Sequence, residues 1–137
     1  MKRLMAILAA CGIALGLTVG AAGTASAAGE VLACRIAPAP ITAQFTTPSC
    51  VTRLAARTYT TAFVVQNETA PFTAAWSVPA HVTIVGGCTS ATIGCTLQWS
   101  SAQDHDVTVS VTLTEAGVPE TLSATAVTSA VCGNVFC

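Results

Sequence analysis

Hydrophobic and polar residues alternate along most of the chain after its first thirty residues, which is the pattern of strands with one buried face. The clearest case is 106–114, DVTVSVTLT, where valine and leucine alternate with threonine and serine. The same alternation predicts further strands over 41–46, 58–66, 72–78, 81–85, 95–99 and 120–131. It slips at Ala126-Val127, which predicts a bulge or a sheet edge there.

The remaining segments are short and carry turn residues. Two prolines in 28–40 predict an extended lead-in, and 50–57 reads as a helical turn or an irregular crossover. Turn signals recur about every ten residues, among them the Gly86-Gly87 pair. We therefore predict an all-β fold, an antiparallel immunoglobulin-like β-sandwich of about seven strands.

Both tryptophans fall on the inward phase of their strands. Trp76 is expected in the core, where its removal would be costly. Trp99 lies at a strand end beside polar residues, so we expect its removal to cost less, and it is also a candidate binding aromatic.

The first residues resemble a secretory signal peptide. Lys2 and Arg3 precede an apolar run from Leu4 to Val19, and Ala25-Ser26-Ala27 has the small-x-small form of a cleavage site. We predict removal of 1–27, a secreted protein, and one domain over 28–137 without a membrane anchor. The alternative is a lipobox ending at Cys11, which would tether the chain to a membrane by a lipid.

Six cysteines follow the predicted cleavage site, an even number that indicates a disulfide framework. We predict sequential pairs, which are Cys34–Cys50, Cys88–Cys95 and Cys132–Cys137. A hairpin brings the ends of the second pair together, whereas Cys34 or Cys50 pairing with the tail remains open. A zinc site is not expected, because there is no Cys-x-x-Cys pair and the two histidines have no ligand spacing. No metal or other cofactor is predicted.

Charge and motifs narrow the function classes. Three arginines stand against six carboxylates after residue 27, a net charge of −3, and no basic stripe is present to bind nucleic acid. The one acid-base cluster is Asp104-His105-Asp106, whose neighbours would point to opposite faces of a strand. The nucleophile motif Gly-x-Ser-x-Gly is absent. We expect no catalytic residues and no enzyme.

The segments WSVPAHVTIVGG, TLQWSS and DVTVSVTLTEAG together resemble the polycystic-kidney-disease-like (PKD-like) immunoglobulin-fold domains of bacterial secreted and surface proteins. The resemblance runs from about Tyr59 to Val127. It implies a non-catalytic module that spaces, adheres or binds.

The leading hypothesis is thus a secreted β-sandwich that binds or displays an unidentified protein, glycan or small molecule. Its preferred contact is the loop between Cys88 and Cys95, with Thr89, Ser90 and Ile93 as candidate binding residues beside Trp99. Two alternatives are a secreted enzyme inhibitor and a small-molecule carrier. The carrier is suggested because composition, size, acidity and local disulfides are similar to those of the actinomycete apoproteins of the neocarzinostatin type.

Overall fold

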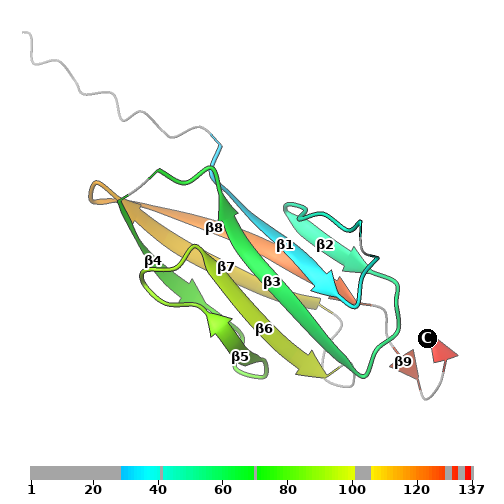
Figure 1. Ribbon diagram of the computed structural model, residues 1–137. Helices are drawn as coiled ribbons and strands as arrows, with labels where there is room; N and C mark the ends of the chain where they lie inside the picture. Colours follow the sequence, from blue (N-terminus) through cyan, green and yellow to red (C-terminus); the bar gives the residue numbers. More distant parts are fainter. Residues whose placement is uncertain are drawn as a thin grey trace, which may run out of the picture.

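The computed structural model describes residues 29–40, 42–69, 71–100 and 106–128, together with the backbone of 131–132 and 135–136. These residues form strands and turns, with no helix among them (Figure 1). The strands are β1 (Val31–Ala37), β2 (Ser49–Thr52), β3 (Thr58–Gln66), β4 (Phe72–Ser77), β5 (Thr83–Gly87), β6 (Gly94–Ser100), β7 (Asp106–Glu115), β8 (Val118–Thr128), β9 (Val131–Cys132) and β10 (Val135–Phe136).

Two four-stranded sheets make the sandwich, with orders β1-β3-β6-β5 and β2-β8-β7-β4, and β9 and β10 form a separate hairpin. Without β2, the two orders are those of an immunoglobulin constant-type domain. The predicted β-sandwich is therefore confirmed. All pairs are antiparallel except β2 with β8, which run parallel. The edge strands β1 and β2 lie on one side of the molecule, and β4 and β5 lie on the other (Figure 1).

The core lies between the inward faces of the two sheets. Four residues of β7 are fully buried, as the alternation predicted, and they are Val107, Val109, Val111 and Leu113. From the opposite sheet, β3 contributes Tyr59, Phe63 and Val65, and β6 contributes Leu97 and Trp99. Burial of this apolar layer is the main stabilising contribution to such a fold.

The first part of the chain differs from the prediction. The proposed lead-in contains β1, whose residues Leu32 to Cys34 are buried in an unbroken run, and its prolines begin only after the strand ends. The predicted strand over 41–46 is wrong, because Thr46 makes only a single bridge, to Cys34, and Phe45 is exposed. Of the two alternatives for 50–57, the helical turn is wrong, since Ser49–Thr52 is a strand paired with β8, whereas 53–57 is an irregular crossover to β3 in the other sheet.

Two predictions in the second half are also corrected. The strand predicted over 81–85 is observed as β5, Thr83–Gly87; Ile84, which alternation places on the same face as Val82, is 53% exposed, because β5 is an edge strand with a register shift between Ile84 and Gly86. The bulge expected near Ala126 is absent, since β8 pairs with β7 in continuous register from Val118 to Val127. The alternation continues there through buried Thr128, and β8 lies inside its sheet rather than at an edge.

The two tryptophans exchange the roles expected of them. Trp99 is only 3% exposed, and its ring lies 6.1 Å from that of Tyr59. Trp76 faces inward but stays half-buried, because β4 is an edge strand. Alternation indicates which face a residue occupies, whereas the depth of burial depends on the place of the strand in its sheet.

Two of the three predicted disulfides are confirmed, Cys34–Cys50 and Cys88–Cys95. The third, Cys132–Cys137, lies outside the residues whose side chains are described, as do the predicted signal peptide and the pair Asp104-His105. Cys132–Cys137 stays a prediction. Non-reducing peptide mapping should link these two cysteines, and a peptide joining either one to Cys34 or Cys88 would contradict the sequential pairing.

The packing also ranks the tryptophans for mutagenesis. Trp99→Ala should lower the free energy of unfolding by about 3–5 kcal/mol, the usual cost of removing a buried indole. Trp76→Ala should cost clearly less, because its side chain is only partly buried on the edge strand β4. Urea denaturation of both variants measures this order, and a larger loss for Trp76→Ala would contradict the packing described.

Candidate functional site

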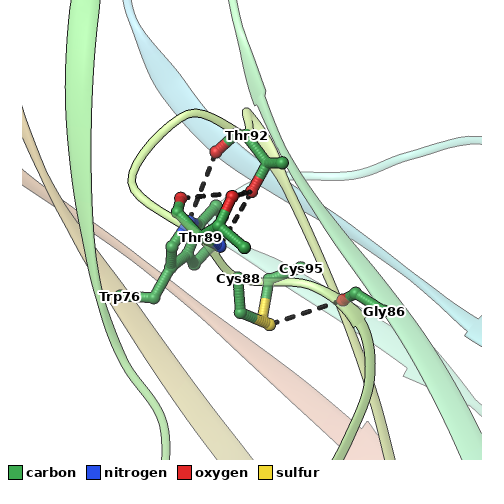
Figure 2. Close-up of a disulfide and its surroundings, with 6 residues drawn as sticks. All are labelled: Trp76, Gly86, Cys88, Thr89, Thr92 and Cys95. Carbon is green, nitrogen blue, oxygen red and sulfur yellow. Dashed lines mark hydrogen bonds between the residues drawn. A yellow bond between two sulfur atoms is a disulfide. The ribbon is translucent and has the colours of Figure 1, made fainter.

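The loop closed by Cys88 and Cys95 is held by a disulfide and by internal hydrogen bonds (Figure 2). Cys88 N donates a hydrogen bond to Gly94 O, with 2.9 Å between the atoms, and Thr89 N donates to Thr92 Oγ1 at 2.9 Å. Gly87 enters the loop with a φ of 67°, and a Cβ at this position would collide with the carbonyl of Gly94. Glycine at position 87 is thus required by both conformation and space.

The same loop is bound to both sheets. Ser90 O accepts a hydrogen bond from Ala74 N of β4 at 3.0 Å, and Ile93 O accepts one from Val65 N of β3 at 2.8 Å. The indole Nε1 of Trp76 donates to Thr92 O at 3.3 Å (Figure 2). The loop therefore covers part of the free edge of β4, which is a structural role of its own.

Of the four predicted binding residues, two are exposed to solvent and two pack against or within the core. Thr89 and Ser90 are exposed at the loop, whereas Ile93 packs against the core. Trp99 is buried beneath β6 and offers no surface to a ligand. What remains exposed at the loop is a small, uncharged surface with two hydroxyl groups.

A groove of about 560 Å³ lies on the opposite edge of the sandwich, between β1, the segment that follows it, and β2. We call it the β1–β2 groove. Its lining includes two arginines and several apolar side chains, among them Arg35, Arg53, Pro40, Val51 and Leu54. Sequence reasoning did not find it. A usable indication was present, because all three arginines after residue 27 fall within 35–57.

Covalent and hydrogen-bonded contacts hold the walls of the groove together. Cys34 of β1 is joined to Cys50 of β2, which itself lines the groove. Cys34 and Thr46 exchange two backbone hydrogen bonds of 2.8 and 3.0 Å, and Thr52 Oγ1 donates to Pro38 O at 2.9 Å. The segment after β1 is thereby fastened at both sides.

The arginines of the groove are exposed and have no carboxylate partner in the described ranges. A guanidinium without an ion pair keeps all its donors for a ligand or for water. The groove is also apolar, since Val51 is 64% and Leu54 46% exposed. Positive charge and exposed apolar surface therefore occur together at this place.

The third site is a pair of carboxylates, Glu30 and Glu115, which lie where β1 begins and where β7 turns into β8. Glu30 is 7% exposed and its Oε1 has no hydrogen-bond partner. Burial raises the pKa of Glu30, and the hydrogen bond and charge of Glu115 raise it further. The Thr69 hydroxyl, which donates to Glu115 Oε2 at 2.6 Å, lowers the pKa of Glu115. Of these two carboxyl groups, Glu30 therefore keeps its proton to a higher pH than Glu115 does.

The described residues contain no group of three or more histidine, cysteine or carboxylate side chains arranged to hold a metal ion. They also contain no helix that is long and apolar enough to cross a membrane. The two disulfides are typical of a protein that matures in an oxidising compartment.

Comparison with known proteins gives no match to a protein family, to a curated protein or to a solved structure. The immunoglobulin-like strand order is a property of the fold alone, and a fold does not specify a function. The function of the chain is therefore inferred from the chemistry of the sites above.

Because of the Glu30–Glu115 pair, we expect the folding stability of the protein to depend on pH. A raised pKa in the folded state makes the stabilising contribution of Glu30 complete at low pH, and it is lost as pH rises through the folded pKa. The lowered pKa of Glu115 acts in the opposite direction, and its contribution is lost only as pH falls below the ordinary glutamate range. Glu30→Gln, which keeps the neutral form, should therefore raise the melting temperature near pH ~7 and change it little near pH ~4.

Thermal unfolding of the variant at both pH values measures this difference. Glu68→Gln is the control, because it removes a carboxylate from the neighbouring β3–β4 connection and leaves the pair intact. An equal shift at both pH values, or the same effect in the control, would contradict the assignment.

Proposed function

We propose that the chain is a secreted, non-enzymatic binding module that holds its ligand in the β1–β2 groove. The observation that supports this is the groove itself, about 560 Å³ in volume. Ligand sites in proteins are commonly concavities of about 300–1,000 Å³ that combine an apolar lining with a few well-placed polar groups. This groove has both features.

The rigidity of the walls favours binding as well. A site that is already ordered before the ligand arrives loses less conformational entropy on association. The Cys34–Cys50 disulfide and the hydrogen bonds of Thr46 and Thr52 supply that order. The two disulfides agree with a place of action outside the cytoplasm, and the signal peptide proposed for 1–27 would deliver the chain there.

The groove is a better candidate than the loop between Cys88 and Cys95. Much of the loop's hydrogen-bonding capacity is used within the loop and on β4. The groove keeps two charged groups and apolar surface for a partner. Concavity also favours a small molecule over a flat protein or glycan surface, so the carrier hypothesis is retained as the form that binding takes.

A matched pair of substitutions tests the site. Ala43→Trp places a large ring in the groove lining, and Ala91→Trp places the same ring on the exposed loop at the opposite edge. Protein purified from the medium of a producing culture should carry a ligand visible by native mass spectrometry. We expect Ala43→Trp to lose that ligand and Ala91→Trp to keep it.

Circular dichroism and the melting temperature of each variant show that it is folded. If Ala91→Trp alone lost the ligand, the binding site would be the loop between Cys88 and Cys95 rather than the groove. A ligand retained equally by both variants would refute the groove as the binding site.

A further inference from the structure

We infer that the β1–β2 groove selects a small amphipathic carboxylate, that is, an aliphatic or aromatic acid whose anionic group meets the two arginines while its apolar body lies along Val51 and Leu54. The inference rests on the proposed function, because it names the class of ligand for the same groove.

The positive charge of the groove favours a negatively charged ligand. Arg35 and Arg53 both line it, and neither forms an ion pair with a carboxylate of the described segments. Guanidinium groups match the planar carboxylate by paired N–H···O hydrogen bonds, which are stronger than those between neutral groups. A carboxylate would therefore find donors that no group within 29–40, 42–69, 71–100 or 106–128 already occupies.

The apolar surface decides between a bare anion and an amphipathic one. Val51 and Leu54 are two of the large apolar side chains that the described part of the chain leaves exposed. Pro40 and Ala43 extend the apolar lining. An inorganic anion would leave this surface in water, whereas a hydrocarbon body would cover it and gain the free energy of burial.

The positions of the charged residues also favour binding of an anion at the groove. Four of the five carboxylates in the described ranges, Glu30, Glu68, Glu115 and Glu120, lie around the start of β1, the β3–β4 connection and the β7–β8 turn, and the fifth, Asp106, begins β7 at the opposite end of that strand. The three arginines lie at or between β1 and the start of β3. Anions are therefore repelled from the acidic region and attracted to the groove, an arrangement that speeds encounter.

The size of the groove argues against a long acidic peptide as the occupant. A volume of about 560 Å³ suits a drug-sized molecule. An acidic protein segment would need a wider interface, usually about 800 Å² on each partner. The small carboxylate is thus the class to which the groove is assigned, and the peptide becomes an outcome of the test.

Isothermal titration calorimetry with three probes tests the ligand class. Decanoate carries both features, decanol lacks the charge, and acetate lacks the hydrocarbon chain. We expect decanoate to bind at least about tenfold more tightly than either of the others. Arg35→Ala and Arg53→Ala should each weaken decanoate binding by about tenfold and leave decanol binding unchanged.

Arg57→Ala is the matched control, because Arg57 is exposed and close in sequence but does not line the groove. It removes the same charge and should bind decanoate like the wild type. An equal loss in all three arginine variants would show long-range attraction rather than a site and would overturn the inference. Equal affinity for decanoate and decanol would overturn it too.

A glutamate-rich peptide that binds more tightly than decanoate, and loses affinity in Arg35→Ala, would replace the small carboxylate by an acidic peptide. The two proposals fail separately. If Ala43→Trp releases the culture-derived ligand but decanoate does not bind, only the ligand class is wrong. If Ala43→Trp releases neither the culture-derived ligand nor decanoate, the groove itself is not the site.

Discussion

The bond between Cys34 and Cys50 is the constraint on which one whole edge of the sandwich depends. β1 belongs to one sheet and β2 to the other, so the chain changes sheets between them. The disulfide joins the two strands across this change, with 5.6 Å between the Cα atoms and both cysteines buried. It thereby closes the core at the edge where two strands of opposite sheets meet.

The segment between these cysteines is shaped by that closure. Because both ends are fixed, the chain must leave β1 and return within a short distance, and the described residues 38–40 and 42–48 form a loop whose Thr46 bridges Cys34 of β1. The loop is bonded to β2 through Pro38 O, which accepts a hydrogen bond from Thr52 Oγ1, and residues of the loop and of β2 line the β1–β2 groove. The cross-link therefore holds together the two strands that line the groove.

The opposite edge is closed in a different way. There the disulfide Cys88–Cys95 holds a tight loop within one sheet, and hydrogen bonds from Ala74 and Trp76 connect that loop to the other. The edge strand β5 stays open, with Ile84 and Val85 exposed and no charged residue in Thr83–Gly87. One edge is thus shaped around a concavity, and the other is covered by a compact loop.

Alternation along the sequence predicted those strands that have one buried and one exposed face. β3, β4, β6 and β7 are of this kind, and their inward residues were correctly assigned. β1 was not predicted because Leu32 to Cys34 are buried without alternation. β2 was not predicted because four residues are too few to show a clear period. The loop disulfide was predictable for a local reason, namely a hairpin with cysteines at both ends.

The candidate sites were less accessible to such reasoning because they join segments distant in sequence. The groove combines β1, the loop after it and the segment beyond β2, and its two arginines are ordinary surface residues until the fold places them together. Glu30 and Glu115 lie far apart along the chain, and no local pattern indicates that one carboxyl is buried against the other. The groove and the carboxylate pair both arise from tertiary contacts, and the periodicity of the sequence carries no information about such contacts.

The placement of the three ring systems gives the protein two optical reporters. Trp99 lies in the core near Tyr59, the one tyrosine of the chain, so their emission follows the integrity of the whole sandwich. Trp76 is bonded to the carbonyl of Thr92, so its emission follows the attachment of the loop to β4. Fluorescence can therefore separate a local opening of that loop from global unfolding without any introduced label.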